Sequence, residues 1–190
     1  MRKSLIIAFI FTFLSFTGLA AGQVPTSGNV FFGYSYLNTD VSPSGRNSSN
    51  GWEATLEGKV FPLIGILADF SAYYGSSNLT VPSACPVSIP SCGPLVANVS
   101  ISEHNYLFGP RVSVSVSKFR PFGEATIGVG HINANAAGSD TSFATALGGG
   151  LDYRLFRIVA WRFQGDYLQT RFFSRTQNNV RISTGIAVHF

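Results

Sequence analysis

The last eleven residues of the chain, 180–190, alternate strictly between two kinds of side chain. Successive side chains of a β-strand point to opposite faces, so this segment predicts a strand with one apolar and one polar face. The apolar set is Val180, Ile182, Thr184, Ile186, Val188 and Phe190, and the other set is Arg181, Ser183, Gly185, Ala187 and His189. This apolar face must be buried against a protein core or against lipid, and the pattern in the rest of the sequence distinguishes the two.

The same alternation recurs upstream, again with charged residues in the middle of the strand. In residues 52–60 the apolar positions face away from Glu53 and Glu57, and in residues 159–168 they face away from Arg162. The sequence has no helical segment that could cover these apolar faces. A barrel closed in lipid resolves this, because apolar side chains contact acyl chains, charges pair inside, and closure leaves no unpaired strand edge.

The chain contains about eight such segments, so the predicted fold is all-β: an eight-stranded antiparallel up-and-down transmembrane β-barrel. Long polar loops alternate with short turns, and in outer-membrane barrels the long loops are extracellular. The long loops are predicted at residues 38–50, 75–102, 132–142 and 169–179, and the short turns near residues 61–65, 118–120 and 154–158. Both ends of the mature chain should then lie on the periplasmic side.

The first 22 residues have the pattern of a secretory signal peptide that is removed on export. Arg2 and Lys3 form a basic start, an apolar run follows, and small residues occur near position 20. A membrane-anchor helix is the alternative, but the apolar run is short for a span. Residues 23–190 would then form the mature barrel, exported through the inner membrane and placed in a bacterial outer membrane.

The charge balance and the cysteines narrow the function further. Without Arg2 and Lys3, 11 basic residues stand against 9 acidic ones, and an excess of +2 is too weak to indicate a nucleic-acid partner. Cys85 and Cys92 are the only cysteines, and they lie in a Pro- and Ser-rich segment. In an exported chain this pair predicts a disulfide rather than a metal site.

The inward faces of the predicted strands carry charged residues of both signs. A barrel of about eight strands has a lumen just wide enough for side chains to fill, and an unpaired buried charge is costly. The favoured interpretation is a network of ion pairs that plugs the barrel. The alternative is a functional one, a narrow ion path or gate through this network. The interior residues are Glu53, Glu57, Lys59, Asp69, Arg111, Glu124, Asp152, Arg162, Asp166 and Arg181.

The sequence carries no motif for catalysis, for a cofactor or for a metal. Ser102, Glu103 and His104 lie at one expected rim of the barrel, and His131 and Asp140 lie at another. Some barrels of this size modify lipids with His and Ser near the outer rim, but no motif ties these five residues together. Solvated rim side chains are the simpler interpretation, so we expect no enzymatic activity.

Several short motifs are spread along the mature chain: FGYSY at 32–36, GWE at 51–53, PFG at 121–123, ALGGGLD at 146–152, QGDYLQTRF at 164–172, and the terminal Phe190. With these motifs the chain resembles small OmpA/OmpX-type, opacity-protein-like outer-membrane β-barrels. The resemblance implies that the barrel-assembly machinery reads Phe190 as a terminal insertion signal.

The sequence thus predicts a monomeric outer-membrane barrel with a structural or surface-interaction role, in adhesion or envelope integrity. Its expected partners are outer-membrane lipid and lipopolysaccharide, the assembly machinery during insertion, and a surface partner that binds the loops. Arg46, Arg171 and Arg175 are candidates for contacts with lipopolysaccharide phosphates, with plain solvated charges as the alternative. Two other functions stay open: a narrow passive channel of the porin kind, and a secreted soluble β-sandwich binding module.

Overall fold

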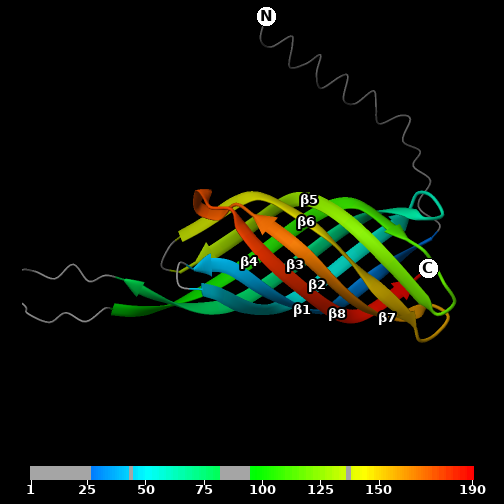
Figure 1. Cartoon of the computed structure of the whole chain (residues 1–190), viewed down its shortest axis with the longest axis horizontal. Coiled ribbons are helices and arrows are strands. Elements are labelled where there is room, and N and C mark those ends of the chain that lie inside the picture. Colours follow the sequence, from blue (N-terminus) through cyan, green and yellow to red (C-terminus); the bar gives the residue numbers. More distant parts are fainter. Residues whose placement is uncertain (1–26, 43–44, 82–94, 136–137) are drawn as a thin grey trace, which may run out of the picture.

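The computed structural model describes residues 27–42, 45–81, 95–135 and 138–190, which form a single closed β-barrel (Figure 1). The strands are β1 (Gly28–Ser42), β2 (Gly45–Lys59), β3 (Ile64–Val81), β4 (Leu95–Ser113), β5 (Phe119–Ala134), β6 (Gly138–Arg154), β7 (Val159–Thr170) and β8 (Gln177–His189). Each strand pairs antiparallel with the next, and β8 closes the barrel on β1. The predicted eight-stranded up-and-down barrel is confirmed, and the two-sheet sandwich is wrong as an architecture.

Side chains alternate between the inside and the outside of the barrel along each strand. In β7 the alternation is unbroken from Ala160, which is buried, to Thr170, which is also buried. Large apolar side chains point outward, where Phe32, Ile127 and Leu147 are 63%, 59% and 66% exposed. The polar set points inward, so the polarity is the inverse of that in a soluble barrel, as the sequence predicts.

The strands are longer than the sequence predicts, and this corrects the loop boundaries. Most of residues 38–50 belongs to β1 and β2, and residues 75–81 pair with residues 95–101 as an extension of β3 and β4. Likewise β5 and β6 leave only residues 135–137 between them, and a short 3-10 helix, η2 (Phe172–Ser174), lies within the segment between β7 and β8. Backbone pairing continues beyond the apolar outer band because it needs no apolar alternation, and a polar paired strand therefore resembles a loop in sequence.

The two ends of the barrel differ in their connections. We call the end that carries the β1–β2, β3–β4, β5–β6 and β7–β8 connections the hairpin end, and the other the turn end. The turn end has tight connections at residues 60–63, 114–118 and 155–158, close to the predicted positions. Gly28 and Phe190 also meet there, with each backbone N–H donating to the other's carbonyl at 3.0 and 3.1 Å. Figure 1 shows the carboxyl terminus beside these turns.

Two predictions concern segments that lie outside the described residues. The signal peptide at residues 1–22 and the disulfide between Cys85 and Cys92 both lie outside the described residues. Phe190 is described, and its side chain is 58% exposed at the turn end. Within the described ranges, no helix has the length and apolar character needed to span a membrane.

Candidate functional site

The interior of the barrel gathers all ten charged residues that the sequence assigns to it. Each comes from a strand in which it shares the inward parity with other buried positions. Nine of them are at most 5% exposed, and Lys59 lies nearer the turn end with a side chain that is 11% exposed. The structure divides these residues between a cluster around Arg181 and a second, larger cluster around Arg162 and Arg111.

Arg181 on β8 is surrounded by three carboxylates. Its Nη2 lies 2.6 Å from Asp69 Oδ2, and its Nε lies 2.8 Å from Asp166 Oδ2 and 3.6 Å from Glu53 Oε2. Gln164 helps to satisfy the surplus of acceptors, because its amide nitrogen donates to Glu53 at 2.6 Å and to Asp166 at 3.1 Å. All five side chains are at most 3% exposed, so this cluster is buried from water.

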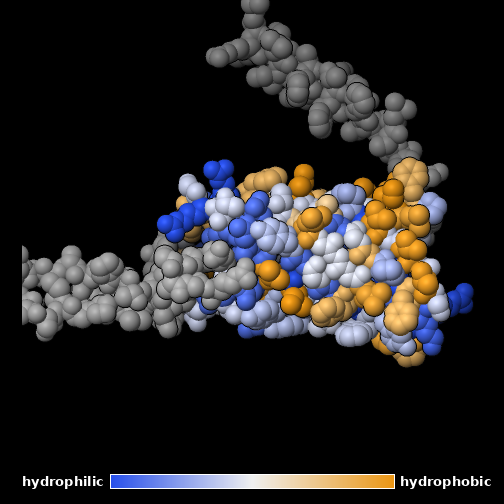
Figure 2. Space-filling model, viewed as in Figure 1, coloured by the Kyte–Doolittle hydropathy of each residue, from blue (hydrophilic) through white to orange (hydrophobic). Residues whose placement is uncertain are grey.

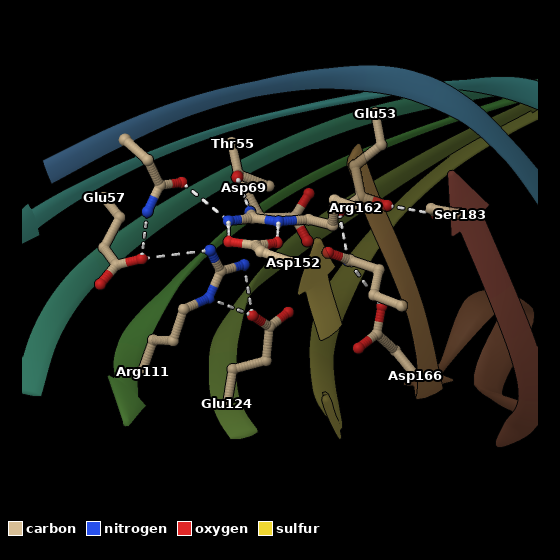
Figure 3. Close-up of polar contacts among 12 residues, drawn as sticks. Glu53, Thr55, Glu57, Asp69, Arg111, Glu124, Asp152, Arg162, Asp166 and Ser183 are labelled. Atoms are coloured by element: carbon tan, nitrogen blue, oxygen red, sulfur yellow. Dashed lines mark hydrogen bonds and ion pairs between the residues drawn. The ribbon is translucent and has the colours of Figure 1, made fainter. Parts of the chain in front are cut away.

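Arg162 on β7 makes the first part of the second cluster (Figure 3). Its Nε and Nη2 donate to the two carboxylate oxygens of Asp152 at 2.6 and 2.9 Å, which is a bidentate arrangement. The same Nη2 donates to Asn29 Oδ1 at 3.0 Å, and the Asn29 amide in turn donates to Glu57 Oε2 at 2.6 Å. Asn29 therefore connects the Arg162 pair to Glu57.

Arg111 on β4 makes the second part. Its Nε donates to Glu124 Oε2 at 2.6 Å, and its Nη1 lies 3.3 Å from Glu57 Oε2. The Phe122 ring contacts both arginines, with its centroid 4.4 Å from the guanidinium carbon of Arg111 and 4.8 Å from that of Arg162. Both distances are within the range of a cation–π contact, which favours each of the two positive charges.

Two glycines make room for these ionic groups. A Cβ at Gly148 would collide with the Asp166 carboxylate, and a Cβ at Gly65 would lie 2.5 Å from Glu57 Oε1. Both glycines therefore leave space that a carboxylate fills. The glycines of 148–150, part of the ALGGGLD motif, act here in packing and not in a phosphate-binding loop.

An apolar layer lies inside the barrel on the hairpin side of Arg181, and the sequence analysis does not predict it. Its members come from five strands and are buried to 5% exposure or less: Leu37, Tyr73, Leu107, Ala144, Ala146 and Leu168. Tyr73 connects the layer to the ionic cluster through a 3.0 Å hydrogen bond between its hydroxyl and that of Ser35. The signal was present in the sequence, since Leu107 and Leu168 share the inward parity of Arg111 and Arg162.

Arg120 is a second interior group that lies outside the predicted set. The sequence places Arg120 in a short turn, whereas in the structure it is the second residue of β5 and has the inward parity of Phe122 and Glu124. Its Nη1 donates to His189 Nδ1 at 2.9 Å, and its Nη2 lies 3.7 Å from Glu57 Oε1. Strand parity would have found this residue if the strand had been started two residues earlier.

The rim residues considered for catalysis are not assembled into one site. Glu103 points inward and is 3% exposed, with a 3.0 Å hydrogen bond from the Asn105 amide. His104 is the next residue on the strand and points outward, where its ring meets the Tyr74 ring edge-on. The His131 ring contacts Thr141 at 2.7 Å, and Asp140 Oδ2 accepts a hydrogen bond from the Phe173 backbone at 2.5 Å. In the described part of the chain, no group of three or more His, Cys, Asp and Glu side chains is placed to hold a metal ion.

A closed eight-stranded barrel with an apolar exterior and buried ion pairs has the architecture of the small outer-membrane β-barrels. Among solved structures, the crystal structure of Neisserial surface protein A matches with a TM-score of 0.63 at 12% identity, over 86% of this chain and 97% of that one. A second match is Ail, the attachment invasion locus protein of Yersinia pestis, in a crystal structure with the heparin analogue sucrose octasulfate. The TM-score is 0.56 at 12% identity, and the match covers 86% of this chain and 98% of that one.

At these identities the similarity establishes the fold. The resemblance to small OmpA/OmpX-type barrels is therefore confirmed at that level. No family model and no curated protein matches the sequence.

Proposed function

We propose that this protein is a bacterial outer-membrane β-barrel with a plugged interior, and that its role is structural or surface-interacting, in adhesion or envelope integrity. The single observation that carries the proposal is the filled lumen. Successive layers of ion pairs and apolar side chains occupy it from the turn end to the hairpin end, while the outside is apolar. A protein built in this way presents its connections to the surroundings and has no aqueous channel.

The apolar layer is the reason to favour a plug over a channel. Ion pairs alone can rearrange around a permeating ion, but an ion that passes Leu37, Leu107 and Leu168 would lose its water without gaining a polar partner. These three side chains have no measurable exposure. We therefore expect the purified protein to give no defined current steps in a planar bilayer, and regular steps would support the narrow-channel alternative.

The outer-membrane location is tested by the folding state. We expect the mature chain, folded in detergent, to migrate differently on gels before and after boiling, and to give a β-sheet circular dichroism spectrum before boiling only. In cells, an integral barrel stays in the membrane after carbonate or high-salt washing. A protein that is released by these washes would contradict the location.

At the hairpin end we propose contact with anionic groups of lipopolysaccharide. Arg171 and Arg175 are exposed there, and within the described ranges neither has a carboxylate in ion-pairing distance. The Arg46 side chain is outside the part of the structure that is described. The complex of Ail with a sulfated heparin analogue shows that a barrel of similar fold binds a polyanion. Arg171→Gln/Arg175→Gln should weaken binding to lipopolysaccharide in a pull-down, and unchanged binding would exclude these two residues.

We further propose that the protein is a monomer without enzymatic activity, and that the assembly machinery recognises the terminal Phe190. Phe190→Ala should then lower the amount of protein assembled in the outer membrane without changing folding in detergent. A lipid-modifying activity that is lost in His104→Ala would contradict the absence of catalysis.

A further inference from the structure

The turn end of the barrel opens into a pocket with a strong excess of basic residues. The pocket has a volume of about 270 Å³, and its lining includes the side chains of Lys59, Lys118, Arg120, Arg154, Arg157 and His189. Asp152 is the only acidic residue of the lining, and Arg162 already occupies both of its carboxylate oxygens. The pocket therefore offers cationic groups without an equal number of anions.

The inner basic residues of the pocket are held in place. Lys59 Nζ donates to Ser113 Oγ at 2.6 Å and lies 3.0 Å from Glu57 Oε1. Arg120 donates to the same Ser113 oxygen from Nη2 at 3.0 Å and to His189 from Nη1 at 2.9 Å. These contacts form a positively charged floor whose side chains are already ordered, which lowers the entropic cost of binding an anion.

The outer basic residues are not held by ion pairs in the part of the chain that the structure describes. Lys118, Arg154 and Arg157 are exposed, and in the part of the chain that the structure describes none of them has a carboxylate within 4.0 Å. Lys118 and Arg154 are neighbours, because the Arg154 backbone N–H donates to the Lys118 carbonyl at 2.8 Å. Three free cations therefore surround an ordered basic floor, and this arrangement suits a phosphate group.

The residues around the pocket indicate which kind of molecule would carry the phosphate. Two turns at this end of the barrel expose large apolar side chains: Phe61 at 63% and Leu63 at 52% on one turn, and Leu155 at 46%, Phe156 at 71% and Ile158 at 54% on the turn that carries Arg157. Figure 2 shows hydrophobic side chains gathered toward this end on the visible face. Apolar side chains beside Lys and Arg are typical of segments that lie in the membrane interface, with the basic groups at the level of the lipid phosphates.

We propose that this pocket binds the phosphate of an anionic phospholipid headgroup from the leaflet that surrounds the turns. The inference rests on the proposed membrane location. The exposed apolar turns hold the lipid tails, the free cations Lys118, Arg154 and Arg157 approach the phosphate, and the ordered floor of Lys59 and Arg120 completes the positive site. A phosphate free in solution would use the cations but would gain nothing from the apolar turns.

The test is a native mass spectrometry titration of the whole mature chain folded in detergent micelles. The probes are a phosphatidylglycerol, a phosphatidylcholine with the same acyl chains, and inorganic pyrophosphate. We expect one phosphatidylglycerol to bind with about tenfold preference over phosphatidylcholine. Arg154→Gln/Arg157→Gln should remove most of this preference, while Arg171→Gln/Arg175→Gln, which removes the same charge at the hairpin end, should leave it within about twofold.

Three outcomes would overturn the proposal. Equal binding of the two lipids would show that charge does not select the headgroup, and equal losses in both double variants would show a nonspecific effect of net charge. Full displacement of phosphatidylglycerol by pyrophosphate, together with unchanged lipid binding in Phe156→Ser, would assign the pocket to free phosphate instead of lipid. Each variant is first checked for heat-dependent migration, so loss of the barrel is distinguished from loss of the pocket.

Discussion

The two halves of the barrel interior balance their charges in opposite ways. On the hairpin side, a single arginine, Arg181, lies against three carboxylates, those of Glu53, Asp69 and Asp166. On the turn side, the interior residues Lys59, Arg111, Arg120 and Arg162 stand against Glu57, Glu124 and Asp152, and the exposed Lys118, Arg154 and Arg157 add three positive charges at the rim. The barrel therefore does not neutralise its charges layer by layer.

The difference follows from access to water. The acidic half lies beneath the apolar layer and is sealed, so its carboxylates depend on Arg181 and on neutral donors such as Gln164 and Ser183, whose hydroxyl donates to Glu53 at 2.5 Å. The basic half opens into the turn-end pocket, where water and mobile ions can screen the excess charge. A sealed cluster depends on each of its contacts, whereas an open one tolerates a mismatch.

The largest effect should come from the only cation of the sealed cluster. Arg181→Met leaves Glu53, Asp69 and Asp166 buried together without a counter-charge, and we expect a loss of about 3–5 kcal/mol in the free energy of unfolding. Arg120→Met at the open end is the matched control, with a loss of about 1 kcal/mol or less. Urea unfolding of the barrel in liposomes measures both. Equal losses would show that the two halves do not differ.

The apolar seal should be the next most sensitive part. Leu107→Ala removes a fully buried side chain of the apolar layer, and we expect a loss of about 2–4 kcal/mol in the free energy of unfolding. Leu147→Ala makes the same chemical change on the lipid face, where the side chain is 66% exposed and lipid fills the space, so its loss should be clearly smaller. If the two variants unfold at the same urea concentration, the layer is not a packed seal.

A substitution on the outer face of the barrel tests the inward and outward assignment itself. Ile186 lies on the outside of β8, paired with Phe32 and Trp161 and 45% exposed. Ile186→Arg places a charge among acyl chains and should cost about 2–4 kcal/mol at the bilayer midplane. Ser183→Arg places its side chain in the sealed acidic cluster and should instead perturb packing. Its free energy of unfolding should depend on salt differently from that of Ile186→Arg. A bilayer stability of Ile186→Arg equal to that of the wild type would mean that the outward assignment is wrong.

The smallest effect is expected at the open rim. Arg154 is exposed and has no ion-pair partner among the described residues, so Arg154→Gln should change the free energy of unfolding by no more than about 0.5 kcal/mol. The same urea experiment measures it. A loss as large as that of Leu107→Ala would show that the turn end is a structural part of the barrel and not a free binding surface.

Strand parity is enough to assign the face of most charged residues, because nine of the ten charged side chains assigned inward are at most 5% exposed. Arg181, Asp69 and Arg162 are examples, and none of them needed knowledge of a neighbour. The failures have two causes. Arg120 was missed because a strand start was misplaced, and the loops were drawn too long because paired polar strands beyond the lipid lack the apolar signal.

The partners inside the barrel were beyond sequence reasoning. Arg181 meets Asp69, which is 112 residues away, and Glu53 rather than the equally inward Asp152. Which residues share a layer depends on the stagger between all the strands and on their tilt, and neither is encoded in any one strand. The same holds for the apolar layer, which forms only where inward residues of five strands arrive at one level.

The sequence by itself determined that the chain forms amphipathic strands and which face of each strand is apolar. From this it follows that the exterior of the barrel is apolar. It could do so because the two-residue period of a strand is a property of local covalent geometry. Only the tertiary structure decided how the charges are shared out, that an apolar layer seals the acidic half, and that unpaired basic residues surround a pocket at the turn end. Those features depend on closure, which sets the height of every side chain relative to those of the other seven strands.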